Sequence, residues 1–134
     1  MNGEGRREKG EAVKSELSKD AEEFALRVLK MYSFLVQRKK EYILSKQVLR
    51  SGTSIGANLA EAEYAQTRPD FITKMHNALK EASETRYWLR LLNKGGYLSD
   101  KQFANMEMNV QSLLARLVAS LKTVKANLRK EQNG

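Results

Sequence analysis

The sequence predicts an all-α fold, an antiparallel up-and-down four-helix bundle, from three observations. The 134-residue chain has 41% hydrophobic and 30% charged residues, which is the balance of a globular domain and not of a disordered chain. It contains one proline and few glycines away from its ends, which favours long helices over many-turned sheets. Apolar residues recur every three or four positions in four segments that are joined by short connections.

We expect one bundle domain over residues 19–130, with disordered tails at residues 1–18 and 131–134. The N-terminal segment is rich in Gly, Glu, Lys and Arg and has few large apolar groups. Such a segment cannot bury enough surface to offset the entropy that ordering costs. The remaining length suits a single hydrophobic core.

The first helix is expected to begin near Ser18 or Asp20, either of which can cap it, and to end at about Arg38. A break in the apolar pattern at residues 38–41 then predicts a solvated connection. The buried stripe of this helix is expected to comprise Phe24, Val28, Met31 and Leu35.

The second helix is expected from about Ile43 to Gln66, although its middle reads S-G-T-S-I-G-A-N, which by propensity alone indicates a turn. We predict a continuous helix because small residues four apart on one face let a neighbouring helix approach closely. Each glycine costs about 1 kcal/mol of helix propensity, so a kinked or broken helix is the alternative. Asn58 suggests a side-chain hydrogen bond across a helix seam. The small residues are Gly52, Gly56 and Ala60, and the core residues are Leu44, Val48, Ile55, Leu59 and Ala62.

Pro69 marks the start of the third helix, since proline is favourable in a first turn and unfavourable later. Gly95-Gly96 can end this helix in a left-handed conformation, and Ser99 then caps the fourth helix. Connections this short predict antiparallel neighbours. The third stripe is expected to be Phe71, Met75, Leu79, Ala82, Leu89 and Leu92, and the fourth Phe103, Met106, Val110, Leu113, Leu117, Leu121, Val124 and Leu128.

Several classes of protein are disfavoured by what the chain lacks. There is no cysteine, which excludes disulfides and thiolate metal sites. The N-terminal segment is charged and lacks the apolar stretch that a signal peptide contains. No apolar run approaches the roughly 18 residues that a membrane span needs. We therefore expect a cytoplasmic protein with no membrane partner.

Catalytic motifs are also missing. The only histidine, His76, has no carboxylate three or four positions away, so the Glu-x-x-His pattern of bundle metal sites is absent. No Gly-rich phosphate loop, nucleophile elbow or paired catalytic carboxylates occur. We expect no catalytic residues, no metal, no cofactor and no enzymatic activity, with His76 as a surface or packing residue.

The charge pattern points to a polyanion. The formal net charge is +8 and the sequence pI about 9.8, which permits attraction to nucleic acid. Helical spacing places Lys122, Lys125 and Arg129 on one outward face, and Lys46 and Arg50 one turn apart on the second helix. These five residues are the candidate nucleic-acid-binding residues. The alternative is a solvated polar face that keeps the bundle soluble.

Two further groups of residues have interpretations that remain open. Tyr87 and Trp88 beside two arginines can stack on a base, although Trp88 also suits packing at a helix or subunit seam. Helix phasing places three glutamates toward the middle of the bundle, where Arg50 and Arg86 can pair with carboxylates. The glutamates are Glu61, Glu81 and Glu84.

Two blocks of the chain resemble a known family. Residues 49–62, L-R-S-G-T-S-I-G-A-N-L-A-E-A, resemble the S-I-x-A-N-I-A-E core of the bacterial four helix bundle protein family, also called the 23S rRNA intervening-sequence protein family. Residues 70–89, from D-F-I to the run A-L-K-E-A-S-E-T-R-Y-W-L, are similar to the third helix of a subgroup. The resemblance covers roughly residues 20–128.

The resemblance implies an up-and-down bundle that assembles as a ring-shaped homopentamer and has no known catalysis. Some members are encoded inside insertions in ribosomal RNA genes. A related branch is similar to the accessory proteins of diversity-generating retroelements, whose basic barrels associate with a reverse transcriptase and nucleic acid. The family offers no settled catalytic or binding residues to carry over.

We therefore weigh three functions. The first is a non-enzymatic oligomer that binds RNA or DNA through its basic faces, where oligomerisation multiplies weak phosphate contacts. The second is a protein–protein adaptor or accessory subunit, for example of a reverse transcriptase, with no direct nucleic-acid role. The third, an enzyme, has only His76 and several glutamates in its favour.

Overall fold

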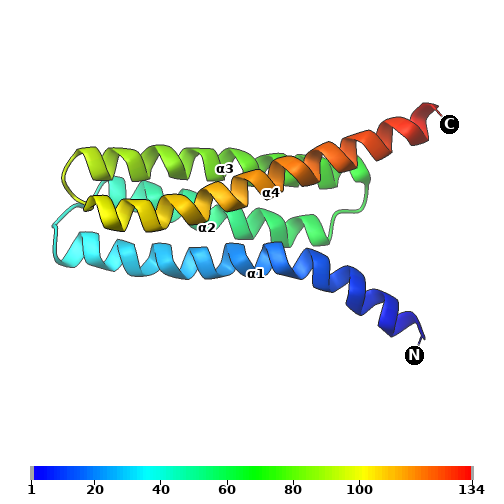
Figure 1. Cartoon of the computed structure of the whole chain (residues 1–134), viewed down its shortest axis with the longest axis horizontal. Helices are drawn as coiled ribbons and strands as arrows, with labels where there is room; N and C mark the ends of the chain where they lie inside the picture. Colours follow the sequence, from blue (N-terminus) through cyan, green and yellow to red (C-terminus); the bar gives the residue numbers. More distant parts are fainter. Residues whose placement is uncertain (1, 134) are drawn as a thin grey trace.

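The computed structural model describes the backbone of residues 2–133 and the side chains of residues 16–133. Four helices follow one another, and no strand occurs in the described backbone. They run up and down in an antiparallel bundle (Figure 1), which confirms the predicted fold class. The helices are α1 (Asn2–Gln37), α2 (Leu44–Glu63), α3 (Arg68–Lys94) and α4 (Asp100–Asn133).

Helices α1 and α4 extend into both segments that the sequence predicts to be tails, residues 1–18 and 131–134. Ser18 does not cap a helix start, because it lies within α1 and its hydroxyl donates to a Glu63 carboxylate oxygen at 3.1 Å. Leu17 packs against the core. The side chains of residues 1–15 lie outside the described residues, so disorder in the tails stays a prediction.

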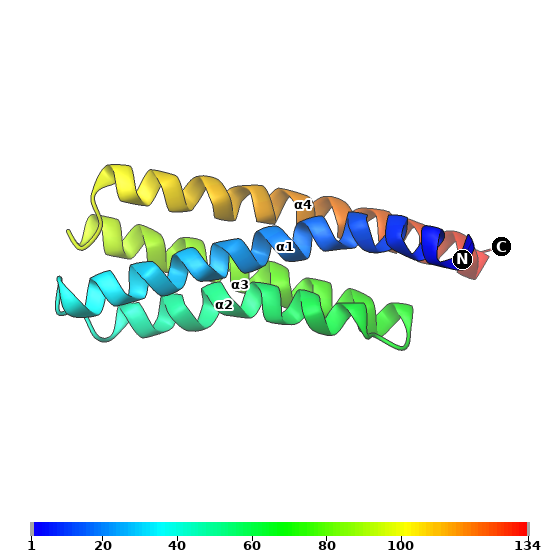
Figure 2. The same cartoon turned by 90° about the horizontal axis from the view of Figure 1, so that it is seen from below.

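The helices pack in chain order, with α2 against both α1 and α3, and α4 against α3. Contact between α1 and α4 is the least extensive of these. Both termini lie at the same end of the bundle (Figures 1 and 2). The α1–α2 and α3–α4 connections lie together at the opposite end of the bundle.

The predicted stripes form the core. All four residues predicted for α1 are buried, and most of those predicted for the other helices are buried too. Leu44, Phe71, Leu79 and Phe103 lie at its edge and are partly buried against it. Ser51 and Thr85 are the polar exceptions between α2 and α3: their hydroxyl oxygens lie 2.9 Å apart, and Thr85 also donates to the carbonyl oxygen of Glu81 (2.7 Å).

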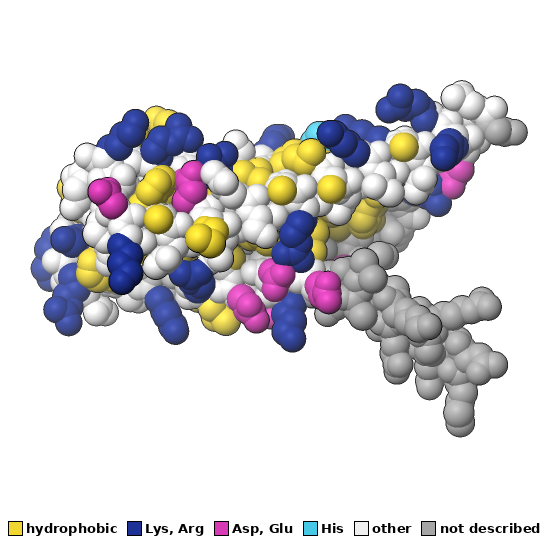
Figure 3. Space-filling model, in the orientation of Figure 1, with side chains coloured by type: hydrophobic (Ala, Val, Ile, Leu, Met, Phe, Trp, Pro, Cys, Tyr) yellow, Lys and Arg dark blue, Asp and Glu magenta, His cyan; other side chains and the backbone are white. Residues whose placement is uncertain are grey.

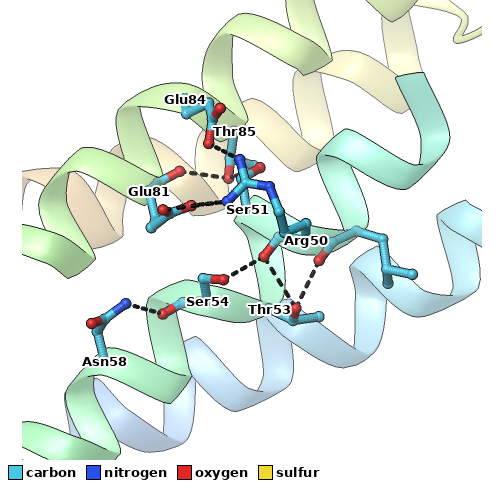
Figure 4. Close-up of polar contacts among 9 residues, drawn as sticks. Arg50, Ser51, Thr53, Ser54, Asn58, Glu81, Glu84 and Thr85 are labelled. Atoms are coloured by element: carbon cyan, nitrogen blue, oxygen red, sulfur yellow. Dashed lines mark hydrogen bonds and ion pairs between the residues drawn. The ribbon is translucent and has the colours of Figure 1, made fainter. Parts of the chain in front are cut away.

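Helix α2 is continuous through its glycines, as predicted. Gly52 lies so close to α1 that a Cβ there would be 2.9 Å from Val28 Cγ2, whereas a Cβ on Gly56 would meet Ala21 at an ordinary 3.7 Å. Ala60 is exposed and takes no part in the close approach. The prediction for Asn58 was wrong, because its amide donates to the Ser54 carbonyl oxygen of its own helix at 2.9 Å (Figure 4).

The connection at residues 38–41 is not solvated throughout, because Glu41 is buried. Its carboxylate accepts hydrogen bonds from the backbone N–H groups of Ile43, Leu44 and Ser45 at 3.2, 3.0 and 2.7 Å. Burial alone would raise the pKa of Glu41, but these hydrogen bonds outweigh it and hold the pKa below its usual value. Glu41 thus satisfies the free amides that begin α2.

The other helix boundaries follow the predicted chemistry. Thr67 caps α3 by accepting from the Asp70 N–H at 3.1 Å, with Pro69 in the first turn. Ser99 and Gln102 cap α4 reciprocally, each side chain accepting from the other's backbone N–H at 3.1 and 2.9 Å. Gly96 has a φ of +85°, the left-handed conformation that lets the chain reverse.

Candidate nucleic-acid interface

Helices α3 and α4 are aligned by polar contacts along their length. Arg86 pairs with Glu107 at 3.0 Å, and the Asn93 amide donates to Asp100 at 2.9 Å. Arg68 pairs with Glu131 near the end of α4. Because the helices are antiparallel, residues later in α3 lie beside residues earlier in α4.

The three basic residues predicted on α4 lie on one exposed face of that helix. Lys122, Lys125 and Arg129 are each exposed, and their spacing of three and four residues places them in one row. The Nζ atom of Lys125 lies 2.8 Å from Nε2 of His76 on α3. The row on α4 therefore lies directly beside α3.

A second row lies along the exposed side of α3, and its first member, His76, meets the row on α4. His76, Lys80, Tyr87, Arg90 and Lys94 recur at helical spacing, and Ser83 fills the remaining position. All are exposed except His76, which is partly buried, and the Tyr87 side chain has an exposed fraction of 51%. At 1.5 Å per residue the row is about 27 Å long.

Together the two rows form what we call the basic face: Lys80, Arg90 and Lys94 of α3 with Lys122, Lys125 and Arg129 of α4. Neither row contains a carboxylate. Figure 3 shows two groups of Lys and Arg side chains along the upper edge of the molecule, over α3 and α4, and others at its left end and lower edge, where acidic side chains lie among them over α1. The side of the bundle that α3 and α4 form therefore carries two groups of cations, in addition to those on α1 and in the α1–α2 connection.

The structure separates Arg50 from the other candidate residues. Its guanidinium pairs with Glu81 at 3.1 Å and with Glu84, both on α3 (Figure 4). The hydrogen bond to Glu84 is the main cause that raises the pKa of Arg50 above its usual value. The predicted pairing of Arg50 with carboxylates is confirmed, and this guanidinium is already neutralised. Lys46 is exposed near the start of α2, away from the row on α4.

The structure also places the other aromatic and charged residues that the sequence singles out. Trp88 packs against the core, and its ring meets that of Tyr87 edge to face at 5.1 Å, so Tyr87 is the ring that stays exposed. Arg86 pairs with a carboxylate as predicted, although its partner Glu107 comes from α4. Glu61 is exposed, and it lies 3.6 Å from Lys74.

Sequence reasoning missed the contribution of α3 to the basic face. The spacing of Lys80, Tyr87, Arg90 and Lys94 is visible in the sequence. What the sequence lacks is the alignment of α3 with α4, which sets His76 beside Lys125.

Other features offer less chemistry. Among residues 16–133, no three His, Asp or Glu side chains are grouped so that they could hold a metal ion. No described helix is long and apolar enough to cross a membrane. A cleft of about 530 Å³ opens between α1 and α4, and its lining is mainly apolar, including Leu17, Leu59, Phe71, Met75 and Val124.

The fold and this surface define an all-α bundle protein with a basic face on α3 and α4. The chain belongs to the 23S rRNA-intervening sequence protein family, whose model matches residues 13–119. It is similar to the crystal structure of a protein of unknown function from the S23 ribosomal protein family of Bacteroides thetaiotaomicron VPI-5482, with 45% identity and a TM-score of 0.80. That match covers 81% of this chain and 97% of the other. No curated protein matches the chain.

Proposed function

We propose that this protein is a non-enzymatic, oligomeric nucleic-acid-binding protein that contacts phosphates through its basic face. The observation that carries the proposal is a band of cations without a carboxylate in either row, which runs along α3 from Lys94 to Lys80 and continues along α4 from Lys122 to Arg129, where Lys125 meets His76. Phosphate contacts by Lys and Arg supply most of the affinity of such proteins. The family's name refers to ribosomal RNA, so RNA is the first polyanion to test.

Binding of RNA at increasing salt tests this proposal. Replacing Lys122, Lys125 and Arg129 together by glutamate should lower the affinity at least tenfold at low salt. It should also reduce the slope of log affinity against log salt by about 2, since each lost contact to a single strand is worth roughly 0.7. The measurement is fluorescence anisotropy of labelled RNA.

A matched control changes the net charge equally but elsewhere. Lys19, Arg27 and Lys30 are exposed on α1, and their replacement by glutamate should preserve more of the affinity and the slope. Arg50→Gln should bind as the wild type does, because Glu81 and Glu84 already neutralise this guanidinium. Equal losses in the two triple variants would mean that overall charge, and not the basic face, drives binding.

The apolar cleft favours a second candidate function, a protein adaptor. Its volume of about 530 Å³ and its lining of core-type side chains offer a surface that a partner's apolar residues can fill. Under this alternative, a stoichiometric protein partner remains bound after nuclease treatment of a pull-down from the native host. Under the first proposal, nuclease removes the associated material.

A further inference from the structure

The α1–α2 loop, residues 38–43, presents an unusual surface at the end of the bundle opposite the termini (Figure 1). Arg38, Lys39 and Lys40 follow one another, and all three are exposed. The next outward side chains are apolar: Tyr42 has an exposed fraction of 52% and Ile43 of 74%. Tyr42 and Ile43 thus form a small exposed apolar surface directly beside a run of cations.

The backbone of this loop is held in one shape by hydrogen bonds. The N–H groups of Arg38 and Lys39 donate to the Phe34 carbonyl oxygen at 2.9 and 3.4 Å, and that of Glu41 donates to Leu35 at 3.0 Å. Lys40 has a φ of 56°, a left-handed conformation that costs a non-glycine residue free energy. Such residues concentrate at functional sites, where the surrounding structure holds them.

The charge of the loop is directed outward. Its one acidic residue, Glu41, is buried and its carboxylate is occupied by three backbone N–H groups at the start of α2. The outer surface therefore carries the three cations of the loop, with Lys46 exposed in the first turn of α2, and no carboxylate of the loop opposes them.

We propose that this loop is a contact for single-stranded nucleic acid, in which a base stacks on Tyr42. This inference rests on the proposed function. The flanking phosphates lie against Arg38, Lys39 and Lys40. An aromatic ring beside consecutive cations is the combination that binds single strands, since a base offers a π-face and its phosphates offer charge. A duplex keeps its bases stacked and gains nothing from the ring, and an acidic peptide uses only the cations. Ile43 extends the apolar surface next to the ring.

The test compares single-stranded and duplex RNA. Tyr42→Ala should weaken binding of a short oligouridine about five- to a hundredfold, the equivalent of one lost base–ring stack, and leave duplex binding unchanged. Tyr42→Phe keeps the ring and should bind as the wild type does. The matched control is Tyr64→Ala at the other end of α2, where the exposed fraction is 84%. Thermal unfolding of each variant checks that the fold is intact.

Other outcomes overturn the proposal in distinguishable ways. If Tyr42→Ala binds oligouridine as Tyr64→Ala does, the loop is not a stacking site, while the basic face stands or fails by its own charge-reversal variants. Equal losses for single strand and duplex also contradict base stacking. If Tyr42→Ala impairs binding to phosphatidylglycerol vesicles instead of RNA, the loop is a membrane contact. If the wild type binds neither oligouridine nor duplex RNA, both the proposed function and the proposed loop contact are overturned.

Discussion

At the scale of single residues, Glu41 shows how one side chain determines the form of a connection. The start of α2 has no cap from the adjacent residue, because Ile43 offers no side-chain acceptor. Glu41, two residues before Ile43, supplies the acceptor instead. The Ser45 hydroxyl in turn donates to the backbone carbonyl oxygen of Glu41 at 2.8 Å. The result is a loop with a buried anion and an outward positive surface.

This arrangement predicts a pH-dependent stability. The folded-state pKa of Glu41 lies below the value in the unfolded chain, so its contribution is complete above the unfolded value and is lost as pH falls through the folded value. Glu41→Gln should lower the free energy of unfolding by about 1–2 kcal/mol at neutral pH, because an amide replaces the charged acceptor. Denaturant titrations at pH 7 and in strong acid measure the difference, which should shrink in acid.

The control for this prediction is Glu23→Gln, on the exposed surface of α1. It should change the free energy of unfolding by no more than about 0.5 kcal/mol at either pH. A Glu41→Gln deficit that stays constant between neutral and acid pH would show that the lost contribution does not depend on ionisation.

At the scale of helices, the two central glycines of α2 have different roles although they share a face. Gly52 meets the branched side chain of Val28, whose Cγ atoms would lie 2.9 and 3.1 Å from an added Cβ. A β-branched side chain has little freedom to move aside on a helix. Gly56 faces Ala21 with room for a methyl group.

Alanine substitutions should therefore have opposite effects at these two positions. Gly56→Ala gains helix propensity without a clash and should stabilise the protein by up to about 1 kcal/mol. Gly52→Ala should destabilise it by about 1–2 kcal/mol, since overpacking outweighs the same propensity gain. Thermal and denaturant unfolding measure both, and Val28→Ala in the Gly52→Ala background should restore part of the loss. Two stabilising substitutions would show that α1 can move away freely.

At the scale of the whole molecule, the outer surface of α1 supports the proposal of an oligomer. Leu26 and Leu29 have exposed fractions of 54% and 45% on the side of α1 that faces away from the core. The partly buried Tyr32 and Val36 continue this apolar surface along the helix. An exposed apolar surface of this kind is a place where a second copy of the chain can pack.

Light scattering of the nuclease-treated protein should give a mass near five times the 15.3 kDa of one chain. Replacing Leu26 and Leu29 by glutamate should shift the mass toward that of one chain, because burying two carboxylates at an apolar interface is unfavourable. Replacing both by methionine should preserve the assembly. A wild-type mass of 15.3 kDa would contradict the oligomer, whatever the variants do.

The sequence predicted the helices well because burial and capping are local patterns. The stripe from Phe24 to Leu35 and the cap at Ser99 need only helix periodicity and side-chain chemistry. Contacts between helices were less predictable, since they depend on how the helices are aligned. Arg50 therefore remained among the candidate phosphate contacts, although two glutamates of α3 neutralise it. The outward display of Tyr42 depends on the burial of Glu41, which periodicity does not reveal.

The close approach at Gly52 also fixes how α1 is aligned along α2. Sliding the two helices by one turn in one direction would bring Val28 toward Val48, whose own branched, buried side chain would replace the glycine that Val28 now faces. Sliding them the other way would bring the ring of Tyr32 toward the hollow at Gly52, which barely admits Val28. Slippage is blocked both ways, so any exchange of α1 between copies of the chain would have to reproduce this same alignment.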